Sequence, residues 1–196
     1  MSVEPAAEPI WTIPNIMSIG RLGAVAAILW AIDTGRWDVA LVLFALASLS
    51  DWLDGFIARR FNQATVLGRQ LDPLVDKVMV IAALVHLAAL PGSGVEPWMV
   101  SIVVARELII QALRSYLESA SVGFGAKMAG KLKMAFQCFA IVAVLLVFRQ
   151  GGESSAGQSL VLLRDSLITI ALLLTIYSGV AYLGRARSIF AKGDQA

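Results

Sequence analysis

The sequence predicts an all-α integral membrane protein whose six transmembrane helices form a single domain over residues 1–196. Hydrophobic residues make up 58% of the chain and charged residues only 15%, whereas soluble domains usually carry about 45–50% and about 25%. A helix needs about 20 mostly apolar residues to cross about 30 Å of hydrocarbon. Six segments approach that requirement: 13–32, 37–58, 71–90, 96–117, 131–149 and 164–184.

The connections between these segments carry turn residues. DTGR occupies 33–36, PGSG occupies 91–94, and the longer QGGESSAGQS occupies 150–159. Clusters of Gly, Pro, Ser and Asp interrupt helices. We therefore expect each of these stretches to separate two helices, with little soluble mass outside the bundle.

The distribution of basic residues predicts the orientation of the helices. With the N-terminus inside, all but three of the 16 Lys and Arg residues fall at cytoplasmic ends or loops, the exceptions being Arg36, Arg149 and Arg164. Lys and Arg are enriched on the cytoplasmic side of membrane proteins. The pattern predicts that both termini are cytoplasmic. We expect a multi-pass protein of the bacterial cytoplasmic (inner) membrane.

Four aspartates lie at the edges of two apolar segments. Asp51 and Asp54 come late in the second segment with i, i+3 spacing, and Asp72 and Asp76 come early in the third with i, i+4 spacing. Such spacings place each pair on one helix face. In the predicted orientation all four meet in the cytoplasmic third of the bilayer, where ionisable groups usually face a cavity or a partner. We expect a polar cavity that opens to the cytoplasm.

Carboxylates gathered in this way indicate a metal site. They would repel one another unless they were protonated or bound to cations, and Mg²⁺ prefers carboxylate and phosphate oxygens. Two ions, Mg²⁺ or Mn²⁺, would balance the four charges and hold a pyrophosphate. Small residues at Gly55 and Ala58 would let a bulky ligand approach, and Arg59 could meet a phosphate. The alternative is a structural role, with each pair salt-bridged to neighbouring arginines.

The stretch from Asp51 to Asp76 also resembles the signature of the CDP-alcohol phosphatidyltransferase family. It reads Asp51-x-x-Asp54-Gly55-x-x-Ala58-Arg59, eight residues, then Gly68-x-x-x-Asp72-x-x-x-Asp76. The resemblance implies a homodimeric transferase that uses CDP-diacylglycerol as donor. It implies that all four aspartates contact metal and that Asp76 is also the general base. The donor would be bound by Asn15, Asp51, Gly55, Ala58, Arg59, Thr65 and Gly68.

A second group of charges bears on the acceptor. Arg106 and Arg114 lie about two turns apart in the fourth segment, and three lysines follow before and within the fifth, at Lys127, Lys131 and Lys133. Cations of this kind suit a second anionic group, such as the phosphate of an acceptor. The alternative is the general positive-inside bias and attraction to anionic lipid.

The stretches IPNIMSIGR and RELIIQALR…GKLKMAFQ resemble the branch of the family that uses sn-glycerol 3-phosphate as acceptor. The expected products are phosphatidylglycerophosphate and CMP. An inositol phosphate acceptor is the nearest rival. A cation-coupled transporter is the rival from another class, but it would need polar groups through the full bilayer thickness. The expected partners are the two substrates and the lipid bilayer, and no nucleic acid.

Overall fold

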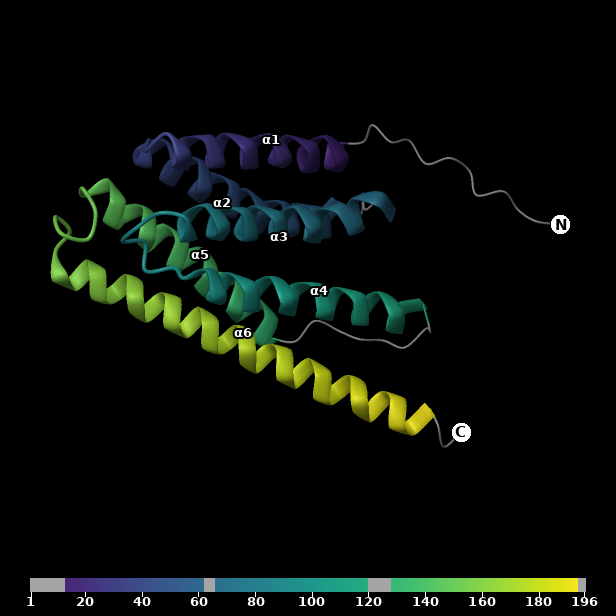
Figure 1. Cartoon of the computed structure of the whole chain (residues 1–196). Coiled ribbons are helices and arrows are strands. Elements are labelled where there is room, and N and C mark those ends of the chain that lie inside the picture. The colour runs from purple at the N-terminus through teal and green to yellow at the C-terminus, as the bar shows by residue number, and fades with distance from the viewer. Residues whose placement is uncertain (1–12, 62–65, 120–127, 194–196) are drawn as a thin grey trace. The chain divides into compact units, whose positions relative to one another are not determined.

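The computed structural model describes the backbone of residues 13–61, 66–119 and 128–193. Side chains are described at 20, 22–50, 74–75, 77–117 and 130–189. The described ranges contain six helices and no strand (Figure 1). The helices are α1 (Ile13–Asp33), α2 (Trp37–Phe61), α3 (Val66–Ala88), α4 (Pro97–Ser119), α5 (Met128–Arg149) and α6 (Gln158–Gly193). The all-helical prediction is therefore confirmed.

Most of the helix bounds lie within a few residues of the predicted segments, and the exceptions have a common cause. α3 begins at Val66 rather than 71, and α6 runs over Gln158–Gly193 rather than 164–184. Hydropathy marks where a segment stops being apolar, whereas Arg, Gln, Leu and Ala keep a high helix propensity outside the hydrocarbon. The polar ends therefore continue as helix.

Glycines end two of the helices at the predicted turns. After α1, Gly35 has φ 68°, its N–H donates to the Ile32 carbonyl, and the N–H of Arg36 donates to the Ala31 carbonyl. After α5, Gly151 has φ 93°, its N–H donates to the Phe148 carbonyl, and the N–H of Gly152 donates to the Val147 carbonyl. Both ends are Schellman caps, which favour glycine because the left-handed conformation crowds a Cβ atom.

The chain divides into two compact units, Met1–Ala82 and Ala83–Ala196. In the first unit, α1 packs against α2. Val25, Ile28 and Ile32 of α1 and Phe44 and Ala47 of α2 are buried. They recur every three or four residues, as expected for one face of each helix.

In the second unit, α6 packs against both α4 and α5 (Figure 1). One face of α6 is buried along most of its length, and its members recur every three or four residues: Arg164, Ile168, Ala171, Thr175, Ser178, Tyr182 and Ala186. Several of these are small or polar, which suits close helix packing in a membrane, where the apolar surroundings give helices no hydrophobic reason to associate.

The opposite face of α6 is apolar and exposed, with Leu162, Leu173 and Val180 among its residues. Of the described residues, two stretches are long and apolar enough to cross a membrane, 130–149 and 158–189, and only 22% of an apolar 18-residue window in the second is buried. An apolar surface of this extent is rare in water. The two stretches therefore support the interpretation that this is a membrane protein. Three further apolar stretches, 22–33, 37–50 and 77–88, are shorter.

Candidate active site

The two pairs of aspartates lie on helices, as predicted. Asp51 and Asp54 belong to α2, and Asp72 and Asp76 belong to α3. Helical geometry brings the members of each pair onto one face, about one turn apart. Their side chains lie outside the described residues, so their metal-binding and catalytic roles stay predictions.

The residues predicted to bind the donor fall on three helices. Asn15 belongs to α1, and Gly68 belongs to α3. Gly55, Ala58 and Arg59 belong to α2. Side chains at these positions are not among those described, and Thr65 lies wholly outside the described ranges. The donor site likewise stays a prediction.

Three of the five predicted acceptor-binding cations are buried or half-buried in the second unit. Arg106 and Arg114 lie on α4, and Lys133 lies near the start of α5. Lys131 is also on α5 but is exposed, and Lys127 lies outside the described residues. Arg106, Arg114 and Lys133 therefore differ from ordinary surface charges, because a buried cation needs compensation by a negatively charged or hydrogen-bonding partner.

Glu107 supplies that compensation. Its Oε1 accepts a hydrogen bond from Arg106 Nη1 at 2.9 Å and pairs with Lys133 Nζ. The Glu107 and Lys133 side chains are each 6% exposed and that of Arg106 is 10% exposed. Glu107 was not among the predicted site residues. The only local signal was an Arg-Glu pair inside an apolar helix, and the Lys133 partner lies 26 residues away.

The Arg106 side chain also crosses α6. Its Cζ lies 5.5 Å from the centroid of the Tyr182 ring, a cation–π contact. A Cβ atom built on Gly179 would lie 3.2 Å from Arg106 Cγ. Tyr182 in turn packs with Ile110 and Leu117 of α4. These contacts join α4 to α6 around a single guanidinium.

The same region carries donors without acceptors. Among the residues that the structure describes, the buried Nε atoms of Arg106 and Arg114 have no hydrogen-bond partner. An orphaned buried donor is costly unless a ligand or water satisfies it. Glu107 contacts two cations, Arg106 and Lys133, so the described polar cluster is rich in positively charged groups.

One further buried polar contact lies about one turn beyond Lys133 on α5. Gln137 Nε2 donates to Thr175 Oγ1 at 3.2 Å, and both side chains are buried. Beyond Gln137, the described buried residues of α5 are all apolar: Ala140, Ile141, Ala143, Val144, Leu145 and Val147. Among the described residues of α5, the buried face beyond Gln137 therefore carries no polar side chain, although α6 keeps buried polar residues such as Arg164 and Ser178.

The six described helices and their long apolar stretches indicate a helical membrane protein with a cluster of buried cations on α4 and α5. The sequence profile of CDP-alcohol phosphatidyltransferase matches residues 11–177, and the chain belongs to that family. It is therefore a phosphotransferase. Enzymes of this family generally use divalent metal ions.

Curated relatives extend this result. The CDP-diacylglycerol–glycerol-3-phosphate 3-phosphatidyltransferase of Rickettsia bellii (strain RML369-C) is 32% identical, over 91% of this chain and 97% of its own. The protein of the same name from Bacillus subtilis (strain 168) is 33% identical, over 70% of this chain and 78% of its own. A cardiolipin synthase (CMP-forming) of Oryza sativa subsp. japonica is 30% identical, over 96% of this chain and 61% of its own.

Proposed function

We propose that the protein transfers the phosphatidyl group of CDP-diacylglycerol to sn-glycerol 3-phosphate, giving phosphatidylglycerophosphate and CMP. The observation that carries this proposal is the similarity to relatives named for this reaction, at 32% and 33% identity over most of the chain. The buried cations of α4 and α5 support it, because the named acceptor carries a phosphate that they could bind.

In this proposal the four aspartates bind the metal ions, and one of them, Asp76, also accepts the proton. Asp51, Asp54, Asp72 and Asp76 offer only oxygen donors, paired on continuous helices, and this set fits Mg²⁺ or Mn²⁺. Two bound ions would neutralise the donor pyrophosphate and its leaving group. Asp76 takes the proton of the acceptor hydroxyl. The acceptor oxygen then bonds to the β-phosphorus, and CMP leaves with the electron pair of the broken P–O bond.

The nucleotide of the donor is assigned to the neighbouring residues. Gly55, Ala58 and Gly68 carry little or no side chain, so that they let the ligand approach the backbone closely. Arg59 offers a charged fork to a phosphate. Asn15 and Thr65 complete the pocket by family resemblance.

The acceptor phosphate is assigned to Arg106 and Arg114, with Lys127, Lys131 and Lys133 around them. Lys133 shares Glu107 with Arg106, so part of its charge is already compensated. Arg106 and Arg114 keep unpartnered Nε donors among the described residues. The two arginines therefore carry most of the direct contact, and Lys133 adds charge.

The membrane setting is also part of the proposal. The shortest helix, α1, has 21 residues, which at 1.5 Å per residue is about 32 Å and enough to cross the hydrocarbon. We assign six spans in one domain over residues 1–196, with both termini and the active site on the cytoplasmic side of a bacterial inner membrane. A homodimer follows from the family resemblance alone.

The test is an assay of CMP release by purified protein with CDP-diacylglycerol and one acceptor at a time. Glycerol 3-phosphate should support turnover, and inositol phosphate, serine and phosphatidylglycerol should not. Turnover with inositol phosphate or phosphatidylglycerol but not glycerol 3-phosphate would replace the proposed acceptor.

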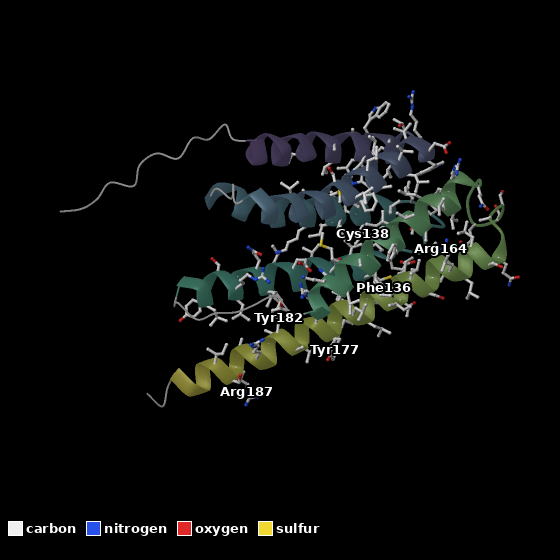
Figure 2. The ribbon with its side chains drawn as sticks, turned by 180° about the vertical axis from the view of Figure 1, so that it is seen from behind. Phe136, Cys138, Arg164, Tyr177, Tyr182 and Arg187 are labelled. Carbon is white, nitrogen blue, oxygen red and sulfur yellow. The ribbon has the colours of Figure 1, made fainter. Side chains whose placement is uncertain are left out.

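The acceptor site is tested by Arg106→Ala, which should raise the KM for glycerol 3-phosphate much more than that for CDP-diacylglycerol. Arg106→Lys should restore little if the contact is a bidentate fork, since an ammonium is a point charge. Arg187→Ala is the matched control, because it removes an exposed arginine of α6 (Figure 2). An equal rise in both KM values would remove the site and leave the donor chemistry standing.

A further inference from the structure

We infer that α6 fixes the position of Arg106, the α4 arginine that binds the acceptor in the proposed function. Gly179 and Tyr182 of α6 act as positioning residues for its guanidinium. The inference rests on the proposed function, since it concerns the phosphate site of glycerol 3-phosphate. Neither residue belongs to the family signature in α2 and α3, and neither need touch substrate. Both would act through Arg106.

The first support is that Arg106 is held from more than one helix. Glu107 Oε1 accepts from Nη1 at 2.9 Å, and the Tyr182 ring centroid lies 5.5 Å from Cζ. Glu107 alone is an incomplete anchor, because the same oxygen also pairs with Lys133. A long side chain with several rotatable bonds needs further contacts to be held in one rotamer.

The second support is the kind of contact that Tyr182 makes. An aromatic ring stabilises a cation through its electron-rich face and does not accept a conventional hydrogen bond. It can therefore fix the guanidinium while its N–H donors stay free for an anion. The Nε donor of Arg106 has no partner among the described residues. Tyr182 itself is buried against Ile110 and Leu117, so the ring cannot move easily.

The third support is the glycine beneath the arginine. A Cβ atom on Gly179 would come within 3.2 Å of Arg106 Cγ, tighter than most real Cβ contacts, so that Arg106 would have to shift by a few tenths of an ångström. Gly179 therefore provides the space in which the arginine crosses α6. A shift of a few tenths of an ångström at Cγ is carried outward, because the guanidinium lies three bonds further along the side chain. Displacements near 1 Å can cost about 100-fold in a positioned reaction.

The aromatic contact is tested with Tyr182→Phe and Tyr182→Leu. Phenylalanine keeps the ring, whereas leucine keeps only apolar packing. Tyr182→Leu should raise both the KM and the calorimetric Kd for glycerol 3-phosphate about 5- to 30-fold, the range of a partly to fully desolvated cation–π contact. Tyr182→Phe should stay within about 2-fold of wild type, by the same principle. If Tyr182→Phe raises the KM and Kd for glycerol 3-phosphate as much as Tyr182→Leu does, the ring does not position Arg106 and this part of the inference is wrong.

The glycine is tested with Gly179→Ala against Gly184→Ala. Both are helical positions on α6, so both substitutions gain the same helix propensity. Only Gly179 has a neighbour within 4 Å, since a Cβ atom on Gly184 would meet nothing within that distance. Gly179→Ala should raise the KM for glycerol 3-phosphate and leave that for CDP-diacylglycerol unchanged. Equal KM values in the two variants would overturn the role of Gly179.

A mutant cycle separates positioning from general damage. If Tyr182 acts only through Arg106, Tyr182→Leu should have no further effect on the KM for glycerol 3-phosphate when Arg106 is already alanine. Additive effects would mean that Tyr182 acts by another route and would overturn the inference. The proposed site itself fails only if Arg106→Ala leaves the Kd for glycerol 3-phosphate unchanged, so the two failures are distinguishable.

Discussion

Replacing Arg164 with methionine should destabilise the second unit without impairing catalysis. Arg164 begins the buried face of α6 and is 2% exposed, next to the connection from α5 (Figure 2). Its Nη1 donates to the Gly92 carbonyl at 2.8 Å, Nε donates to Asp165 Oδ1 at 2.8 Å, and Nη2 donates to Glu153 Oε1 at 3.2 Å. One side chain of α6 thus binds both the connection before α4, through Gly92, and the connection after α5, through Glu153.

The three bonds do not contribute equally. Glu153 and Asp165 have side chains 52% and 51% exposed, and ion pairs open to solvent contribute about 0–1 kcal/mol each. The bond to the Gly92 carbonyl is made by a buried charged donor, and such bonds contribute about 1.5–3 kcal/mol. Arg164→Met keeps the apolar stem and removes all three bonds. The free energy of unfolding should therefore fall by about 2–4 kcal/mol.

The measurement is reversible denaturant unfolding in detergent micelles, followed by tryptophan fluorescence. Glu153→Gln and Asp165→Asn are the matched controls, and each should lower the free energy of unfolding by no more than about 1 kcal/mol. Gly94→Ala should mimic Arg164→Met, because Gly94 has φ 73° and an added Cβ would lie 2.9 Å from Arg164 Nε.

Catalysis should survive because Arg164 is 18 residues before Tyr182 on the same helix, about 27 Å along its axis. The folded fraction of Arg164→Met should keep both KM values. A loss in Glu153→Gln as large as that in Arg164→Met would refute the reasoning, since it would make the exposed ion pair the main contribution.

Three further predictions concern the chemistry. Excess EDTA should abolish CMP release, because the aspartates could not hold a pyrophosphate without cations; turnover in chelator would contradict the metal assignment. Asp76→Asn should keep donor binding and lower the turnover rate about 100- to 10,000-fold, as expected for a lost general base; a rate above about a tenth of wild type would point to another base. Glu107→Gln should lower the free energy of unfolding by about 3–5 kcal/mol, because it leaves Arg106 and Lys133 buried without their carboxylate. Denaturant unfolding should show this loss, and added inorganic phosphate should restore more stability than in wild type; an unchanged stability would mean that the two cations are compensated elsewhere.

The sequence alone was sufficient to predict the helices and turns, because both depend on short-range properties. Runs of apolar residues identified all six helices, and the glycines at 35 and 151 end two of them through local hydrogen bonds. The sequence also predicted that each aspartate pair between Asp51 and Asp76 shares a helix face, since i, i+3 and i, i+4 spacing determines which helical positions lie on one face. The family followed from the same stretch.

The tertiary structure decided how the cations of α4 and α5 are compensated and supported. Arg106, Arg114 and Lys133 were predicted, with two further lysines, as cations suited to an acceptor phosphate. In the structure Glu107 pairs with two of them, and α6 supplies Gly179 and Tyr182 around Arg106. Apart from the Arg106–Glu107 pair, these contacts join residues 26 or more positions apart. They depend on the rotation and register of packed helices, which local periodicity does not specify. Arg106 was therefore predictable as a binding residue from the sequence, whereas the residues that hold its side chain follow only from the packing of α4, α5 and α6.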